Sequence, residues 1–414
     1  MRLTYTLVTV FIALSSPILA QIDQVSVGPS YSQQAYYKIA TGEVETVPNE
    51  AWDIAFSAEG QQDAGVFINE SSSLTSASLL VFLSEISDWS APIIATDELV
   101  DSIALYNPEA TWTEGAFNTV KDPASPFDYG WGIYNPQNHI IEGSRIFIIK
   151  DRQGSFFKFQ VVSLASGSYT FRYADLNGDN EKTFELDKAN AEGSLIYFSF
   201  DTEDEVRMPT DYDLIFQRYS TPLDAGDEMY IPYTVTGVLL APGVEAVVAD
   251  GVDPNNVNEA DYADQYSGLP TVIGHEWKAF DFSSGWVMDQ DRTHFIKDTQ
   301  GSIFQLTFFD FEGSSTGITT MEKKLVGTVA TKEEAPVNST FTVYPNPTTE
   351  YFVVENEHQL PIDIAIVNNK GEVVRTLATS TGVPVEVFSM AAGIYHVSIK
   401  SESEFSNQKL VITK

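Results

Sequence analysis

The sequence of 414 residues contains no cysteine. Disulfide bonds, thiolate metal sites and cysteine nucleophiles are therefore excluded, as is a lipid anchor on an N-terminal cysteine, whose thiol would carry the acyl chain. Hydrophobic residues make up 43% of the chain and aromatic residues 12%, which is typical of globular proteins. The chain is too long for one hydrophobic core, so we expect two or three domains, stabilised by burial alone.

Basic residues are scarce: 23 lysines and arginines stand against 58 aspartates and glutamates, which gives a formal net charge of −35 at pH 7. Such a surface repels phosphate backbones and anionic lipids, which argues against nucleic acid as a partner. The acidity indicates either the solubility of an extracellular surface or the binding of cations.

Long hydrophobic runs are missing beyond the N-terminus. There, Arg2 precedes an apolar run at 7–14, and a helix-breaking Pro17 and the small Ala20 follow. This pattern predicts a secretory signal peptide over residues 1–20, cleaved after Ala20. The run is too short to cross about 30 Å of hydrocarbon, which argues against the alternative of a membrane anchor. We therefore expect no transmembrane segment in the mature chain.

Helical periodicity is also scarce. Segments such as "GSRIFIIKD", "SYTFRYADL" and "SIFQLTFFDF" are rich in β-branched and aromatic residues, and turn clusters such as "DPASP" and "NGDN" separate such segments. Because β-branched and aromatic residues favour strands, while Pro, Gly, Asn and Asp favour turns, the pattern predicts an all-β fold.

The chain repeats itself over long distances. The stretch "IKDRQGSFF" at 149–157 returns as "IKDTQGSIF" at 296–304, with most positions identical. The segment 35–56 likewise has a counterpart at 196–216. In both, paired aromatics precede an acidic turn, a proline and an aromatic–Asp–aliphatic run that ends in Phe.

Since these repeats occur in the same order in both halves, they predict two tandem β domains, 21–190 and 191–328. The two domains should superpose with Gly154 over Gly301.

The composition changes after residue 328. Residues 329–340 contain no aromatic residue and indicate an exposed linker. In 341–414, apolar and polar residues alternate, and "NNKG" predicts a tight turn between two strands. We expect a small C-terminal β-sandwich here.

The C-terminal unit resembles the type A sorting domain of the type IX secretion system of Bacteroidota. Its motifs occur in order: Tyr344-Pro345-Asn346-Pro347, Asn369-Lys370-Gly371, Ala392-Gly393-Ile394-Tyr395 and the terminal Lys409–Lys414. The resemblance implies that residues 341–414 engage the type IX machinery. It also implies that the chain passes through the periplasm and is secreted or held at the outer-membrane surface. An ordinary adhesive β-sandwich is the alternative.

The region before the linker resembles the HmuY family of secreted or surface-bound, β-rich haem-binding proteins. The resemblance rests on Tyr36-Tyr37 with Thr41-Gly42, on the "WDIAF" motif at 52–56, and on the strand Ile149-Lys150-Asp151…Gly154…Phe157-Lys158. It covers most of 31–190 and, more loosely, 191–328. It implies two HmuY-like domains, with a small-molecule ligand for which haem is the candidate.

Histidine, the typical axial ligand of haem in that family, occurs only five times in the chain. His358 and His396 lie in the sorting domain, which leaves His139, His275 and His294 as candidates for haem binding. His139 lies in a polar loop before the repeated strand of the first half, and His294 begins the equivalent strand of the second. Haem iron needs a neutral imidazole and apolar surroundings. A surface or capping role is the alternative for each.

Asp175, Asn177, Asp179 and Glu181 place oxygen atoms at every second position, as in the opening of a calcium loop. The loop's central glycine is not at its expected position, and Leu186 occupies the place of the bidentate glutamate. An acidic β-turn is therefore the alternative. A calcium site requires the oxygens of the first three residues to converge on one point.

No catalytic motif is complete. "HEWKAF" lacks the second histidine of the HExxH zinc-protease pattern, and there is no G-x-S-x-G elbow. We therefore expect a secreted or cell-surface, non-enzymatic binding protein. The alternatives are a structural or adhesive surface protein without haem, and a hydrolase whose carboxylate site cannot be picked out among so many acidic residues.

Overall fold

The computed structural model describes residues 20–60, 63–94, 99, 103–224, 226, 230–328, 341–356, 360–368, 373–401 and 405–413. These residues form two compact units, one up to residue 328 and one from residue 341. The predicted signal peptide, apart from Ala20, and the predicted linker 329–340 lie outside the described residues. Among the described residues, no helix is both long enough and apolar enough to span a membrane.

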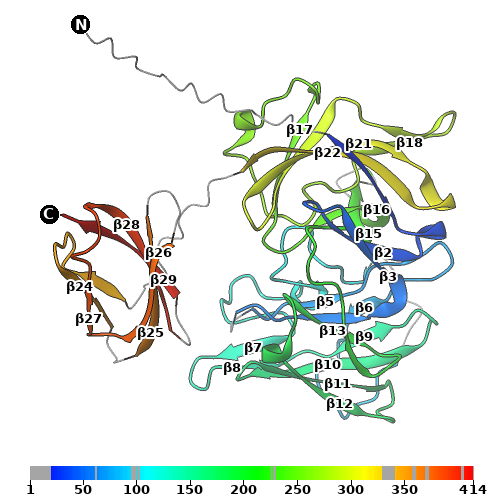
Figure 1. The fold of residues 1–414 in the computed structure, drawn as a ribbon. Coiled ribbons are helices and arrows are strands. Elements are labelled where there is room, and N and C mark those ends of the chain that lie inside the picture. The colour runs from blue at the N-terminus through cyan, green and yellow to red at the C-terminus, as the bar shows by residue number, and fades with distance from the viewer. Residues whose placement is uncertain are drawn as a thin grey trace, which may run out of the picture. The chain divides into compact units, whose positions relative to one another are not determined.

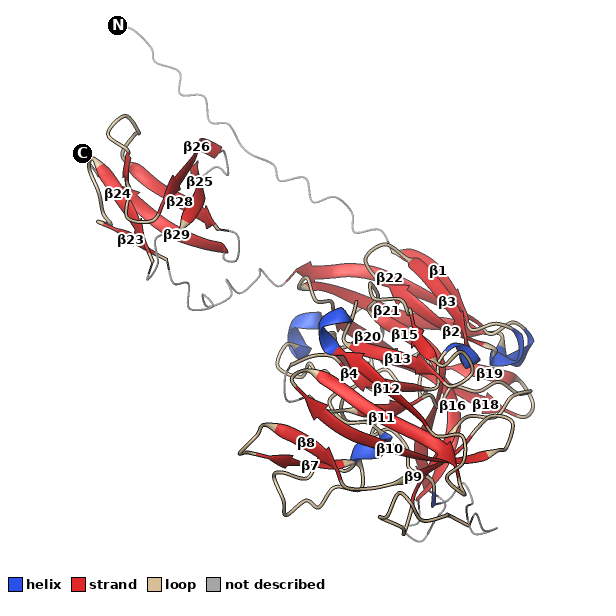
Figure 2. Ribbon diagram, turned by 90° about the horizontal axis from the view of Figure 1, so that it is seen from below, coloured by secondary structure: helices blue, strands red, loops and turns tan. Residues whose placement is uncertain are grey.

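The predicted all-β fold is confirmed. Figure 2 shows strands throughout both units, joined by loops and a few short helical turns. The helical elements in the described part of the chain are 3₁₀ turns: η1 (Pro29–Tyr31), η2 (Asn49–Ala51), η4 (Ala116–Asn118), η5 (Lys188–Asn190), η6 (Glu259–Tyr262) and η7 (Gly313–Ser315).

The first unit stacks four antiparallel sheets as layers (Figure 1). One outer layer is the five-stranded sheet, in the order β1 (Gln21–Ser26), β22 (Ile318–Thr328), β21 (Ser302–Phe311), β20 (Arg292–Lys297) and β17 (Glu245–Asp250). The other outer layer is the seven-stranded sheet, built from β12 (Lys182–Asp187), β11 (Ser168–Asp175), β10 (Phe156–Ala165), β8 (Ile140–Gly143), β7 (Gly132–Asn135), β9 (Phe147–Lys150) and β6 (Leu80–Leu83).

Two four-stranded inner sheets lie between the outer sheets. The first inner sheet has the order β16 (Tyr230–Leu240), β15 (Leu214–Asp224), β2 (Gln33–Lys38) and β3 (Glu43–Pro48). The second has the order β14 (Asp204–Val206), β13 (Leu195–Ser199), β4 (Ile54–Ser57) and β5 (Val66–Ile68). A separate hairpin pairs β18 (Lys278–Asp281) with β19 (Gly285–Met288).

Three hydrophobic cores hold the four layers together, because the inner strands bury both faces. On β2, Tyr37 packs into the core shared with the five-stranded sheet, and Tyr36 packs into the core between the inner sheets. On β4, Phe56 packs against the seven-stranded sheet, and Ala55 faces the other inner sheet. Neighbouring residues of a strand point to opposite faces, so the apolar runs of these strands serve two cores at once.

The two inner sheets arise from an exchange of hairpins between the repeated segments. The hairpin β2–β3 of the first segment pairs with β15 of the second, with Tyr37 opposite Leu214. The hairpin β13–β14 of the second pairs with β4 of the first, with Phe198 opposite Ile54. Each repeat therefore completes its sheet with the hairpin of the other.

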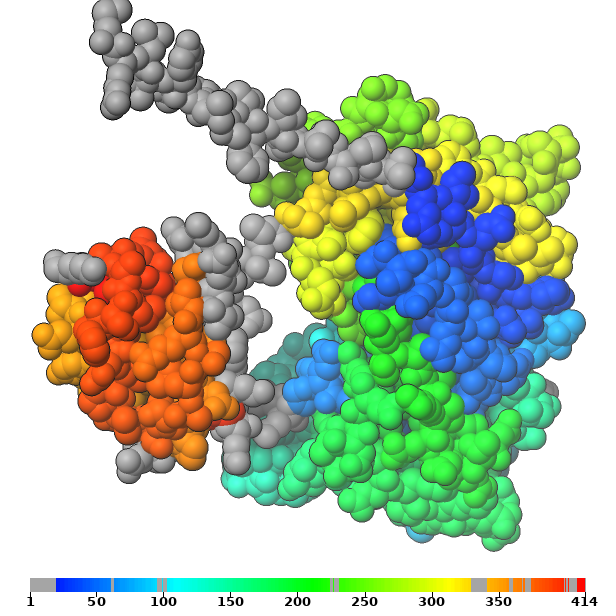
Figure 3. Space-filling model, in the orientation of Figure 1, coloured from blue at the N-terminus to red at the C-terminus, as the bar shows by residue number. Residues whose placement is uncertain are grey.

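This exchange corrects the expected division of the chain at residue 190. Strands from 21–190 and from 191–328 share both inner sheets, and β1 pairs with β22 at the other end of the unit. Figure 3 shows the same closeness, since the blue N-terminal surface lies beside the yellow surface of residues near 310–320. Residues 20–328 are one compact unit, because separating the halves would break both inner sheets.

The most exact repeat in the sequence, expected as one strand in each half, is instead a turn in both places, between β9 and β10 and between β20 and β21. Asp151 Oδ1 accepts hydrogen bonds from the amides two and four residues ahead, at 3.0 and 2.7 Å, and Asp298 Oδ1 does the same at 2.9 and 2.8 Å. Gly154 and Gly301 adopt φ of 88° and 83°, which glycine reaches without strain. Turn chemistry therefore explains why the chain contains this stretch twice.

The second unit is a small β-sandwich, as predicted. A three-stranded sheet, β23 (Thr342–Tyr344), β24 (Tyr351–Glu355) and β27 (Pro384–Glu386), faces a four-stranded sheet, β26 (Val373–Ser380), β25 (Pro361–Asn368), β28 (Gly393–Lys400) and β29 (Phe405–Ile412). Asn346 joins two motifs of the sequence, since it donates to the carbonyl of Lys409 at 2.5 Å and accepts from the amide of Val411 at 2.9 Å. Residues 369–371 of the "NNKG" turn lie outside the described residues.

Candidate functional site

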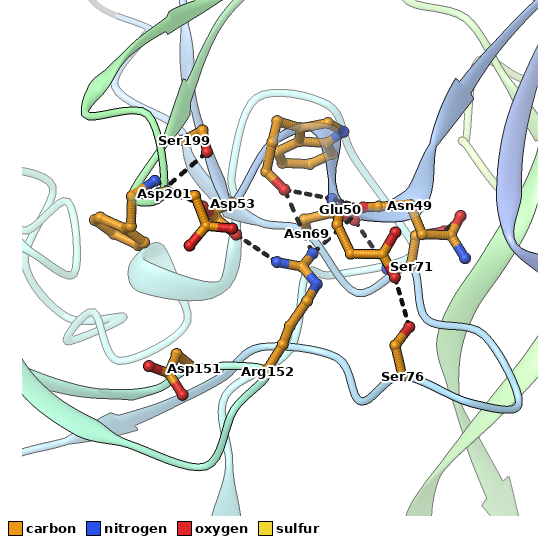
Figure 4. Close-up of polar contacts among 12 residues, drawn as sticks. Asn49, Glu50, Asp53, Asn69, Ser71, Ser76, Asp151, Arg152, Ser199 and Asp201 are labelled. Carbon is orange, nitrogen blue, oxygen red and sulfur yellow. Dashed lines mark hydrogen bonds and ion pairs between the residues drawn. The ribbon is translucent and has the colours of Figure 1, made fainter.

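A buried ion pair between Asp53 and Arg152 joins the "WDIAF" motif to the first of the two repeated turns (Figure 4). Both side chains are only 7% exposed. The second carboxylate oxygen of Asp53 accepts from the amide of Phe200 at 2.6 Å, at the end of the exchanged hairpin. Burial raises the pKa of Asp53, and the Arg152 guanidinium partly offsets that effect.

Backbone carbonyls and polar side chains surround the Arg152 guanidinium on the side away from Asp53. Arg152 Nη2 lies 3.4 Å from the carbonyl oxygens of both Asn49 and Trp52, and Asn69 Nδ2 donates to the same two carbonyls at 2.8 and 2.7 Å. Ser71 Oγ donates to Asn49 Oδ1 at 3.1 Å. Figure 4 shows Arg152 between Asp53 on one side and Asn49 and Asn69 on the other.

The second repeat builds the counterpart around Asp213. Its carboxylate accepts from the amide of Ile39 at 2.9 Å and from Lys38 Nζ at 3.2 Å. Thr299 stands in the repeated turn where Arg152 stands in the first. Each buried aspartate thus has one cationic partner, which comes from a turn in one half and from a strand in the other.

The second repeat, which has Thr299 in place of the arginine, has a pocket at this position. A pocket of about 370 Å³ is lined by Thr299, Lys38, Tyr212 and the segments 190–197 and 205–211. Among its described wall residues there is no histidine, so it does not offer an axial ligand for haem.

His139 lies at the end of the β7–β8 hairpin and is exposed. Its Nδ1 is 2.7 Å from the hydroxyl of Tyr134, and the Tyr134 ring stacks on Phe127 with 6.1 Å between ring centroids. When Nδ1 carries the proton and donates it to the tyrosine oxygen, Nε2 keeps its lone pair for an external ligand.

His294 and His275 lie elsewhere in the first unit. His294, on β20, is 1% exposed, and neither ring nitrogen has a hydrogen-bond partner among the described residues. Burial lowers the pKa of His294 to about 3. His275 is half-buried, with its Nδ1 3.5 Å from the hydroxyl of Tyr219, and burial lowers its pKa as well. Because His139 and His294 belong to opposite outer sheets, the three candidates do not form one site.

The predicted calcium ligands lie in the turn between β11 and β12. Their side chains form hydrogen bonds with one another and with neighbouring side chains. Asn177 Nδ2 donates to Asp179 at 2.8 Å, and Asn180 Nδ2 donates to Asp175 at 2.7 Å. Glu181 instead accepts from the indole of Trp89 at 2.9 Å. The described residues contain no group of three or more histidines or carboxylates placed to hold a metal ion. Calcium binding at this turn stays a prediction.

The sequence analysis did not single out Lys278 and Glu70, two buried side chains whose pKa burial moves to about 7. Lys278 is 7% exposed, and burial lowers its pKa to about 7; its ammonium lies 4.0 Å from the ring centre of Trp277 and donates to the carbonyl of Thr236. Glu70 is 8% exposed, and burial raises its pKa to about 7. The aromatic neighbours in "EWKAF" were a local signal for Lys278, whereas "NESSS" around Glu70 looks like a solvated loop.

Comparison with known proteins identifies two segments of the chain. Residues 342–413 match the family model described as the secretion system C-terminal sorting domain, and residues 30–173 match that of the HmuY protein. No curated protein matches the chain. Among solved structures, dimeric latent PorU from Porphyromonas gingivalis is 12% identical, with a TM-score of 0.15. The match covers 67% of this chain and 32% of that chain, so it spans about a third of PorU's length.

The protein is therefore a secreted, all-β protein, since its sorting domain directs it to the cell surface or beyond. More particularly, it carries one HmuY region, at 30–173. The resemblance is confirmed for that region and for the sorting domain. The match does not extend to 191–328, so a second HmuY-like unit stays a proposal.

Replacing Arg152 with Ala should lower the free energy of unfolding by about 3 kcal/mol, because Asp53 is then buried without its cation. Chemical denaturation of the purified chain measures the change. The matched control is Arg207→Ala, which breaks an ion pair with Glu192 between exposed side chains and should cost about 0.5 kcal/mol or less. Equal effects of the two substitutions would show that burial does not govern the Asp53 pair.

Because neutral His294 is buried, we expect the free energy of unfolding to decrease in acid. The folded His294 pKa of about 3 lies below the ordinary histidine value of 6.5, so between these values the unfolded chain binds the proton and the folded chain does not. Stability should fall by up to about 1.4 kcal/mol per pH unit as pH drops below 6.5. Denaturation series from pH 7 to 4 should show a shallower slope for His294→Leu than for the unsubstituted chain.

Proposed function

We propose that this chain is an exported, non-enzymatic binding protein whose ligand is haem. The observation that carries the proposal is the HmuY match over 30–173, because the HmuY family is haem-binding and non-enzymatic. Of the three candidate histidines, only His139 lies within the matched residues. The exposed imidazole at the end of the β7–β8 hairpin is therefore the proposed axial ligand.

The side chains suit a surface site with one histidine rather than a closed site with two. The bond to Tyr134 orients the His139 ring and presents Nε2. Phe127, 45% exposed, stacks on Tyr134 and extends an apolar surface beside the imidazole, against which a porphyrin could lie. His294 does not fit the role, since it is buried beside Phe308 and out of reach of a large planar ligand.

Haemin titration of the mature protein, followed by absorbance, tests this site. We expect a shifted Soret band that is lost in His139→Ala and kept in His275→Ala, the matched control. Tyr134→Phe should weaken binding by about tenfold, because it removes the bond that orients the ring. A featureless titration would favour the structural or adhesive alternative. A Soret shift that survives His139→Ala would overturn the assignment of the ligand.

We also propose that 191–328 is a diverged HmuY-like unit. The same aspartate contacts around Asp53 and Asp213, together with the same turns at Asp151 and Asp298, support this proposal. The loss of sequence similarity in the rest of the second half agrees with a match that ends at residue 173.

We further propose that the type IX machinery reads residues 341–414. The hydrophobic core of the C-terminal sandwich consists of residues from 341 to 412, and the cores of the first unit consist of residues before 329. Deleting 341–414 should therefore leave the first unit folded, with an unchanged melting temperature, but retained in the periplasm. Cell fractionation measures its location. Normal delivery of the truncated chain to the surface would contradict the proposal.

A further inference from the structure

Aromatic side chains wall a small cavity between the two inner sheets. It measures about 70 Å³, and its aromatic wall residues are Tyr36, Trp52, Phe67, Trp112, Tyr197 and Tyr219. A second pocket of about 290 Å³ adjoins it, since both are lined by Asn107, Pro108, Glu109 and Ser220. The two together form a narrow inner chamber with a wider outer one.

Several polar atoms of this wall already have partners in the protein. Trp112 Nε1 donates to the carbonyl of Leu240 at 2.9 Å, and Trp52 Nε1 and the Tyr36 hydroxyl both donate to Gln34 at 3.3 and 2.9 Å. These three residues therefore offer a ligand mainly ring surface. Aromatic faces attract cations and apolar groups and do not attract anions.

Carboxylates are the only charged groups among the described wall residues. Glu70 lines the inner cavity and accepts from the amides of Asn107 at 2.6 Å and Ser220 at 3.1 Å. Glu109 lines both cavities. Among the described residues, no lysine, arginine or histidine forms an ion pair with Glu70, although burial of a carboxylate without a cation is costly.

The second repeat does not have this carboxylate at the equivalent position. In the first repeat, Ile68 of β5 pairs with Ile54, and in the second, Leu240 of β16 pairs with Leu214. Glu70 comes two residues after Ile68, and the equivalent position two residues after Leu240 is Pro242. Glu70 is therefore a feature that one half has and the other half lacks.

We propose that this cavity binds an alkylammonium group, with Glu70 as its counter-ion and the aromatic rings around it. The inner cavity has room for a group about twice the size of a water molecule, such as an ammonium with its first carbon atoms. The rest of a short alkyl chain extends into the outer pocket, between the prolines Pro108, Pro222 and Pro232. A porphyrin is far too large for this space, so the site is distinct from the one at His139.

Calorimetric titration of the mature protein with n-butylammonium and with n-butanol tests the proposal. The two probes have nearly the same size and differ in charge, so we expect the ammonium to bind at least about tenfold more tightly than the alcohol. Glu70→Gln should weaken ammonium binding by about tenfold or more. Glu50→Gln, at an exposed carboxylate bonded to Ser76 outside the cavity, should leave it unchanged.

A third probe in the same titration identifies the source of the ammonium group. Binding of Nα-acetyl-lysine amide as tight as that of butylammonium assigns the site to a lysine side chain of a peptide, and binding of the free amine alone assigns it to a small molecule. Trp112→Leu serves as a second variant if Glu70→Gln does not fold, and it should weaken ammonium binding several-fold. Equal affinity for amine and alcohol, no binding of either, or full binding by a folded Glu70→Gln protein would overturn the proposal.

Discussion

Two buried aspartates determine how the first unit is assembled. Asp53 and Asp213 each receive a hydrogen bond from the backbone amide at the end of a hairpin that belongs to the other repeat. Each also donates its own amide to that hairpin, at 2.9 Å, to the carbonyls of Phe198 and Tyr37. A buried carboxylate needs such partners, so the hairpins are fixed where the aspartates are. The inner sheets, and with them all three cores, depend on this exchange.

The two aspartates differ in the source of their cation, and this difference shapes the surface. Arg152 fills the space beside Asp53 and contacts the carbonyls around it. Beside Asp213, the charge comes from Lys38 on a strand, and the shorter Thr299 leaves an open pocket. One repeated framework therefore carries a closed polar cluster on one side and a cavity on the other. The repeats differ at Glu70 as well, since Pro242 stands at the equivalent position.

The first unit offers potential ligand sites in different layers. His139 stands at the tip of a hairpin in the seven-stranded sheet, beside aromatic rings that it helps to order. The cavity at Glu70 lies between the inner sheets, where side chains of both repeats meet. Neither site needs the other, because one presents an exposed imidazole and the other a buried carboxylate in an aromatic cavity. An exported protein with a strongly acidic surface is suited to capturing cationic or metal-containing ligands.

Local rules of the sequence determined the all-β class and the C-terminal sandwich, because alternation and turn residues act over a few positions. The sequence also revealed the repeat, but not which hairpin would pair with which strand, since both hairpins carry the same aromatic and acidic pattern. It suggested three histidines, yet only burial separates the exposed His139 from the enclosed His294. Glu70 looked like an exposed loop residue, and only the tertiary structure buries it: Asn107, 37 positions away, and Ser220, 150 positions away, supply the amides that bind its carboxylate.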